Sequence, residues 1–294
     1  TVPGEREGEI LYWRPYVCDA DDTPLCAWGA LQVGGTIQPQ PLVPPDAPQN
    51  LTVTPEAWTN LNLFTVDWAD PGGIAGAYTR VGSSPRYDTD GTYTEDKPLI
   101  VAATEEGEQT LYVWLVGDDG GVDHEQWASA SLRYDGSAPT PPTSIVAWDS
   151  PSHSQTYPDD TWQNADDTLT FEWDGAADSG GSGVRGYSVY WGPDAGGEPG
   201  LTPEQAAADY SAPAFSGTYY LRVRAYDAAG NASPPTTLFT ARYDAQVPTH
   251  PTAVTGWDSV DRAVAYSNDT WQNADHDLYF EWSGASDGGG AGLS

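Results

Sequence analysis

Short runs of strictly alternating apolar and polar residues dominate the sequence. In residues 168–173 the apolar residues Leu169, Phe171 and Trp173 alternate with threonine and glutamate. An extended strand places alternate side chains on opposite faces, so these three side chains are predicted to lie on one buried face. Residues 219–225 alternate in the same way, with arginines at the outward positions. This period of two predicts β-strands.

Further strands are predicted at 186–191 and 237–243, each bounded by turns rich in glycine, aspartate or proline. We find no convincing amphipathic helix in the pattern, although residues 202–208 could form one short helical turn. The pattern therefore predicts an all-β protein made of short strands.

The sequence repeats itself with a period of 109 residues. The motif Asp-Thr-Trp-Gln-Asn-Ala-Asp occurs at 160–166 and again at 269–275. The same offset relates three further landmarks: Trp148 to Trp257, Trp173 to Trp282, and Arg-Tyr-Asp at 133–135 to the same trio at 242–244. A unit of this length is close to one β-sandwich and much longer than a solenoid repeat.

Proline-rich segments at 44–48, 135–142 and 244–251 separate the units. Proline cannot donate to a sheet ladder and stiffens the backbone, so these segments are interpreted as short, semi-rigid joints. The predicted organisation is an N-terminal strand-containing segment at 1–45, Ig-like domains at 46–138 and 139–247, and a partial Ig-like domain at 248–294.

The third unit is too short for a complete sandwich, because its 47 residues supply only about two strands. One expectation is that the natural protein continues beyond this sequence. The other is that a neighbouring subunit completes the fold by strand addition, using its residues 1–45. In that segment residues 9–17 and 30–38 have a strand-like composition.

Two stretches of the second unit resemble a known group of domains. Residues 217–233, Gly-Thr-Tyr-Tyr-Leu-Arg-Val-Arg-Ala-Tyr-Asp-Ala-Ala-Gly-Asn-Ala-Ser, are similar to the penultimate strand and turn of bacterial fibronectin type III and immunoglobulin-like repeats. Trp173 followed by Asp-Ser-Gly-Gly-Ser-Gly-Val at 178–184 resembles strand B and the next loop of the same group. In the first unit Trp68 and residues 111–116 resemble a related variant.

The resemblance covers residues 46–294 and implies tandem immunoglobulin-like, fibronectin type III-like β-sandwiches. It also implies structural roles for certain aromatic residues. Trp68 and Trp173 would be core tryptophans, Trp282 is the repeat counterpart of Trp173, and Tyr219 would be the corner tyrosine, with a buried ring and a hydroxyl bonded to nearby backbone.

The charge balance is strongly acidic, with 11 basic residues against 43 acidic ones and a net charge of −32. Such a surface disfavours binding to nucleic acid and to anionic membrane surfaces. It either keeps an extracellular protein soluble or supplies oxygen ligands for Ca²⁺. Asp178, Asp227 and Asp287 are the candidate ligands. No cofactor is assigned, and calcium stays open as a hypothesis.

The two cysteines, Cys18 and Cys26, are close in sequence and could close a hairpin loop as a disulfide in an oxidising compartment. The alternative, a metal pair, lacks the further ligands that a closed zinc site needs. The sequence contains no run of about 18 apolar residues, which is the length that a helix needs to span a bilayer. The chain begins at Thr1 and contains no methionine, which suggests a removed leader and an extracellular or cell-surface location.

The sequence offers little catalytic chemistry. The four histidines, at 124, 153, 250 and 276, form no paired motif and are expected at the surface. No nucleophile elbow or phosphate loop is present, and the adjacent aspartates at 118–119, 159–160 and 166–167 fall in predicted turns. We therefore predict that the chain is not an enzyme.

Two functions remain. The first is a structural or adhesive surface protein, a stalk or filament-forming array that associates with itself or with a cell-surface or glycan partner. The alternative is a carbohydrate-binding accessory module of a larger secreted enzyme, which the 13 tryptophans and 17 tyrosines motivate.

Overall fold

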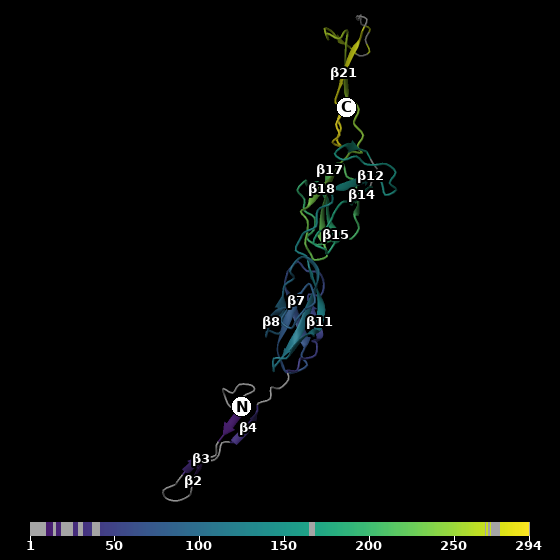
Figure 1. Cartoon of the computed structure of the whole chain (residues 1–294). Coiled ribbons are helices and arrows are strands. Elements are labelled where there is room, and N and C mark those ends of the chain that lie inside the picture. Colours follow the sequence, from purple (N-terminus) through teal and green to yellow (C-terminus); the bar gives the residue numbers. More distant parts are fainter. Residues whose placement is uncertain are drawn as a thin grey trace. The chain divides into compact units, whose positions relative to one another are not determined.

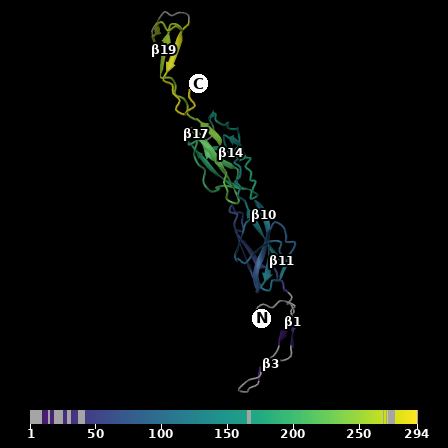
Figure 2. The ribbon, with the colours of Figure 1, turned by 60° about the vertical axis from the view of Figure 1, so that its left-hand side comes forward.

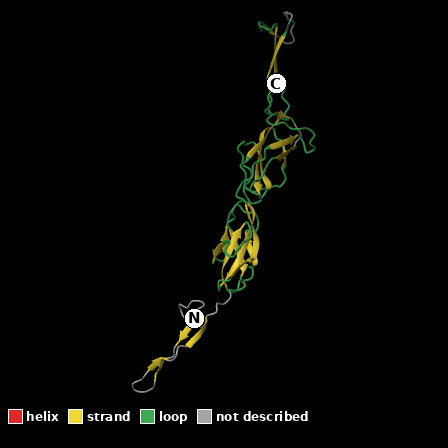
Figure 3. Ribbon diagram, viewed as in Figure 1, coloured by secondary structure: helices red, strands yellow, loops and turns green. Residues whose placement is uncertain are grey.

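The computed structural model describes residues 42–164, 168–267, 269, 271 and 277–293, and the backbone of four strands within residues 10–36. All regular elements in these ranges are β-strands (Figures 1 and 3), and Figure 2 shows them from a second side. No helix long and apolar enough to cross a membrane occurs in the described part. The predicted helical turn at 202–208 is absent, because this stretch is a loop in which Gln205 forms a β-bridge with Tyr187.

The first pair of sheets is built from residues 49–134. One sheet has the order β5-β6-β9 and the other the order β11-β10-β7-β8. The bounds are β5 Gln49–Thr54, β6 Phe64–Ala69, β7 Ile74–Val81, β8 Thr92–Thr94, β9 Leu99–Val101, β10 Gly107–Gly117 and β11 Val122–Tyr134. Alternate residues of β6 and β10 are buried, including Phe64, Val66, Leu111 and Val113.

The second pair of sheets has the orders β12-β14-β16 and β13-β18-β17-β15. The bounds are β12 Ser144–Trp148, β13 Trp162–Gln163, β14 Thr168–Asp174, β15 Val184–Gly192, β16 Asp209–Pro213, β17 Gly217–Asp227 and β18 Thr236–Tyr243. Neighbouring strands are antiparallel except β13, which pairs with β18 in parallel. This strand order, three strands opposite a sheet with a long central hairpin, is that of an immunoglobulin-like sandwich.

The predicted alternation in the second unit is confirmed. Leu169, Phe171, Leu221 and Val223 are fully buried, and Trp173 is almost so. They belong to one core in which the Phe171 and Phe239 rings lie 5.3 Å apart. Full burial of each such side chain stabilises the fold by about 1.5–3 kcal/mol.

The third sheet has the order β20-β19-β21, with β19 Ala253–Trp257, β20 Ala265–Tyr266 and β21 Tyr279–Ser283. In the described part of the chain no second sheet pairs with it. Trp282, which the repeat relates to the buried Trp173, is therefore not hidden between sheets: it is 68% exposed, against 5% for Trp173. The structural role expected of Trp282 therefore stays a prediction.

The N-terminal strands form two short antiparallel pairs. β1 (Ile10–Trp13) pairs with β4 (Gln32–Thr36), and β2 (Tyr16–Cys18) pairs with β3 (Cys26–Trp28). Cys18 and Cys26 are directly opposite each other in the second pair. Opposite residues of an antiparallel ladder have Cα atoms about 4.5–5.5 Å apart, within the range of a disulfide. The side chains lie outside the described residues, so the disulfide stays a prediction.

Contacts along the chain define two compact units, and the division runs through β5, β6, β9, β10 and β11 rather than through the proline-rich segments. The boundaries predicted at 46, 139 and 248 therefore stay predictions.

Candidate functional site

Three carboxylates meet beside the second pair of sheets. Asp135 follows β11, Asp178 lies in the loop between β14 and β15, and Asp227 ends β17. Oxygen atoms of the three side chains all lie within 4.8 Å of one another. Asp135 and Asp227 are fully buried and Asp178 is partly buried.

Backbone amides of the β14–β15 loop hold two of these carboxylates. The Ser182 N–H donates to Asp135 Oδ2 at 3.1 Å. The Gly183 N–H donates to Asp178 Oδ2 at 2.6 Å, and the Gly180 N–H donates to Asp178 Oδ1 at 3.3 Å. Glycines and serines suit this loop because their small side chains leave the amides accessible to the carboxylates.

The third carboxylate organises the turn after β17. Asp227 Oδ1 accepts the N–H of Gly230 at 2.7 Å and that of Asn231 at 2.8 Å. The Asn231 amide donates to Asp227 Oδ2 at 2.7 Å and also reaches the carbonyls of Asp135, at 2.9 Å, and Ser137, at 3.1 Å. The segment that enters the second unit is thus fastened to two loops of that unit.

The same arrangement recurs 109 residues later. The Ala291 N–H donates to Asp244 Oδ2 at 3.0 Å, and the Gly292 N–H donates to Asp287 Oδ2 at 2.7 Å. Asp244 and Asp287 are the repeat counterparts of Asp135 and Asp178. The repeat therefore reproduces the fastening as well as the strands.

The oxygen-only donor set is of the kind that binds hard divalent cations, and Asp135, Asp178 and Asp227 are the residues that could hold Ca²⁺. The sequence singled out Asp178 and Asp227, and the structure brings them together. Asp135, the third member of the group, was not among the residues that the sequence indicated as calcium ligands. The available signal was the Arg-Tyr-Asp trio that precedes both proline-rich segments at the same offset.

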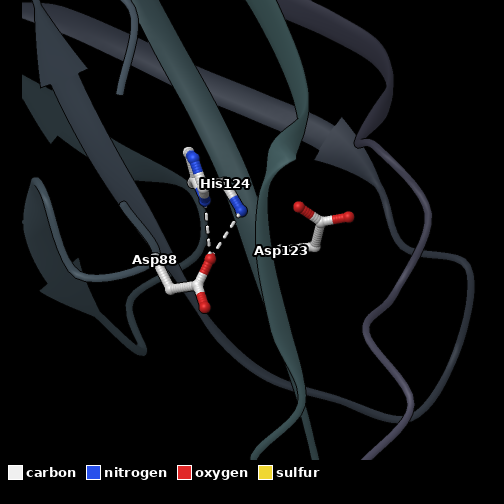
Figure 4. Close-up of side chains that lie close together, drawn as sticks. All are labelled: Asp88, Asp123 and His124. Carbon is white, nitrogen blue, oxygen red and sulfur yellow. Dashed lines mark hydrogen bonds and ion pairs between the residues drawn. The ribbon is translucent and has the colours of Figure 1, made fainter. Parts of the chain in front are cut away.

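A second group joins Asp88, Asp123 and His124, whose potential ligand atoms also lie within 4.8 Å of one another (Figure 4). Asp88 Oδ1 accepts the His124 backbone N–H at 3.0 Å and lies 2.7 Å from His124 Nδ1. The hydrogen bond from the His124 side chain, followed by that from its backbone, lowers the pKa of the Asp88 carboxyl. His124 is consequently partly buried and paired, rather than a free surface histidine as expected.

This pair fixes the loop between β7 and β8 over the outer face of the sheet. The Trp114 Nε1–H donates to the Asp88 carbonyl at 2.8 Å, and Trp114 is fully buried beneath the loop, with its ring stacked 5.5 Å from that of Tyr78. Asp88 Oδ1 is already engaged by His124, through both the backbone N–H and Nδ1. We therefore interpret the group as a loop clamp and not as a metal centre.

The aromatic residues singled out by the sequence have different environments. Trp68 is buried, and its Nε1–H donates to Asp70 Oδ1 at 2.7 Å. Tyr219 is only half-buried and stacks 5.5 Å from Trp191.

The corner role expected of Tyr219 is not seen. In the second unit the Tyr157 hydroxyl donates to Arg242 O at 2.7 Å, and the Tyr226 hydroxyl donates to Gly200 O at 2.6 Å. Tyr219 lies near the start of β17, where its ring contacts those of Trp191 and Phe215.

No family model matches the sequence, and no curated protein is similar to it. Among solved structures, the fibronectin(III)-like modules of Clostridium thermocellum CbhA are 16% identical, with 66% of this chain and 94% of that chain covered and a TM-score of 0.34. A crystal structure of titin domains is 15% identical, with 71% of each chain covered and a TM-score of 0.38.

The strand orders themselves, rather than these distant likenesses, define the class. The chain is an all-β tandem of immunoglobulin-like sandwiches of the fibronectin type III kind.

Proposed function

We propose that this chain is a non-catalytic structural segment of an extracellular or cell-surface protein, in which immunoglobulin-like modules form a stalk or a filament. The observation that carries the proposal is the repeated fastening of the incoming segment by Asp135 and, one period later, by Asp244. Modules joined by fastened segments suit a load-bearing or spacing role better than modules on free linkers.

The charge and the site chemistry support the same proposal. A net charge of −32 favours the solubility of a segment exposed to water. The polar groups that gather in the described part, around Asp135 and around Asp88, bond to backbone amides: those of Ser137 and Ser182 for Asp135, and that of His124 for Asp88. Neither group presents a nucleophile beside a general base, which is the arrangement that hydrolytic or transfer chemistry needs.

Antibody labelling of intact cells of the organism that encodes the chain tests the location. We expect labelling of unpermeabilised cells and loss of the signal after protease treatment of their surface. Label that appears only after permeabilisation would contradict the proposal. An intracellular protein labelled in parallel provides the control for cell integrity.

Carbohydrate binding is the second candidate, and one feature favours it. Trp127 of β11 is exposed and its ring meets that of Tyr112 of β10 edge-on at 4.9 Å, which gives the outer face of this sheet an aromatic surface. Binding of the purified chain to a glycan array, lost in Trp127→Ala and kept in a Tyr87→Ala control, would favour this function. An array without binding would favour the structural one.

A further inference from the structure

Two described segments of the chain contain a triplet in which an asparagine is followed, two residues later, by serine or threonine. They are Asn-Leu-Thr at 50–52, in β5, and Asn-Ala-Ser at 231–233, after β17. Such a triplet is the acceptor sequence for N-linked sugars when its middle residue is not proline. A third copy, at 268–270, includes residues outside the described ranges. The surroundings of the two described asparagines decide which of them can be modified.

The first triplet lies at the surface. Asn50 and Thr52 are both exposed, and Leu51 between them is partly buried. Asn50 has a left-handed backbone (φ 52°), a conformation that asparagine adopts more readily than most residues. The Thr52 hydroxyl donates to Asp67 O, in β6, at 3.2 Å. An enzyme that approaches β5 from outside would therefore meet both the acceptor amide and the hydroxyl of the triplet.

The second triplet is part of the structure of its turn. Nδ2 of Asn231 donates to the carbonyls of Asp135 and Ser137 at 2.9 and 3.1 Å, and to Asp227 Oδ2 at 2.7 Å. Ser233 is only 2% exposed, and its hydroxyl is bonded to backbone groups. A sugar on Nδ2 leaves this nitrogen with a single hydrogen, so Asn231 could not keep these bonds. The second triplet is therefore closed to modification in the folded chain.

Strand β5 also has a use for a bulky polar group. It lies at an edge of the sheet β5-β6-β9, and its sequence, Gln-Asn-Leu-Thr-Val-Thr, contains no charged residue. Edge strands usually carry charges, lysine above all, that prevent pairing with strands of other chains, and this chain contains one lysine, outside β5. A hydrated sugar chain on Asn50 would block this edge instead.

We propose that Asn50 is the attachment site of an N-linked sugar chain. Attachment joins Nδ2 of Asn50 to the anomeric carbon of a sugar and breaks the bond between that carbon and the phosphate of a lipid-linked donor. The released phosphate takes the electron pair of the broken bond, and one Nδ2 proton passes to the solvent. The inference rests on the proposed extracellular location, because this acceptor sequence is used in secreted proteins.

Mass spectrometry of the chain isolated from the organism that encodes it, after reduction and digestion with trypsin, gives the test. Trypsin cuts after arginine and lysine unless proline follows, so the three triplets fall in separate peptides, at 7–80, 225–242 and 263–294. We expect peptide 7–80 to carry the mass of a sugar chain and peptide 225–242 to have its unmodified mass. Fragmentation that retains the sugar should place it on Asn50.

Two variants produced in the same organism distinguish this attachment from other modifications. Thr52→Ala keeps Asn50 but removes the hydroxyl of the triplet, so peptide 7–80 should lose its sugar. Thr52→Ser keeps the triplet, so the sugar should remain. Because Thr52 is exposed, neither change alters the core.

A chain taken from the cell surface with an unmodified peptide 7–80 would overturn the inference and leave the proposed location standing. Sugar that remains on this peptide in Thr52→Ala would overturn it too, because attachment would then not depend on the triplet. Sugar on peptide 225–242 would show that accessibility does not select the site, with the same result. A chain that antibodies label only after permeabilisation would instead remove the proposed location, so the two failures can be distinguished.

Discussion

The Ser182 amide donates a hydrogen bond to the Asp135 carboxylate across 47 residues of sequence, and its repeat counterpart, from Ala291 to Asp244, has nearly the same length. Because the same interaction occurs in two copies of the repeat, it is a property of the repeating unit and not of one particular loop. Gly180, two residues before Ser182 in the same loop, allows a first test of this interaction.

Gly180 has no room for a side chain. A methyl group placed on it would overlap the Asp135 carboxylate, and one on Gly289 would overlap Asp244. We expect Gly180→Ala to destabilise the second unit by about 1–3 kcal/mol, the usual cost of overpacking a tight site. Urea unfolding measures this. Gly196→Ala, where the methyl would meet only ordinary contacts, should change the free energy of unfolding little.

Calcium should act through Asp135, Asp178 and Asp227. If the ion occupies this group, its binding to the folded state alone raises the midpoint of thermal unfolding, and a chelator lowers it. The shift should disappear in Asp178→Asn, which keeps the shape of the side chain and removes its charge. An unchanged midpoint with and without chelator would end the calcium hypothesis.

The Asp88–His124 pair makes stability depend on acid pH. The pKa of Asp88 is lower in the folded chain than its unfolded value of about 3.9, so the unfolded state binds more protons in this range. The contribution of Asp88 is present above that value and is lost as the pH falls below it. We expect Asp88→Asn to lower the free energy of unfolding at pH 7 and to differ less from wild type at pH 3. Asp96→Asn, on an exposed turn, should follow wild type throughout.

Tyr157 makes stability depend on alkaline pH. Burial raises the pKa of its hydroxyl to about 12, so the folded chain keeps this proton when the unfolded chain loses it. The contribution is complete below pH 10 and is lost as the pH rises to about 12. Tyr157→Phe should flatten this part of the stability profile. Its loss of the bond to Arg242 O should also cost about 1 kcal/mol at neutral pH.

Phe171 and Phe280 form a matched pair within one molecule, since they hold the same place in successive units. Phe171→Ala opens a cavity in a closed core and should cost about 3–5 kcal/mol. Phe280→Ala removes a side chain from an open sheet and should leave the free energy of unfolding of the second unit unchanged. Similar large losses for both variants would show that the third sheet is covered.

The strands around Phe171 and Val223 could be predicted because the alternation of buried residues is a local property of the sequence. Most residues of strand β11 are partly or fully exposed, so little alternation marks this strand in the sequence. The clamp between Asp88 and His124 joins residues 36 positions apart, and nothing in the local sequence specifies such a pairing.

The carboxylate group illustrates the same limit more closely. Asp178 and Asp227 could be selected because each begins a turn rich in small residues. Asp135 has a signal of its own, its recurrence as Asp244, but that recurrence by itself indicates only a joint between units. Recognising it as a partner required knowing that the chain enters the second unit beside the β14–β15 loop, which is a tertiary property.

The fastening of Asp135 to the Ser182 loop has a consequence for how such a protein can grow. With the module boundaries that the sequence predicts, one half of the bond lies at the end of a module and the other half in the module that follows, and both recur at the period of the repeat. A gene segment of one period, duplicated in frame, would therefore bring compatible halves to both of its new junctions. Lengthening or shortening the array by recombination needs no new joint, so the number of modules can change in evolution without any change in their chemistry.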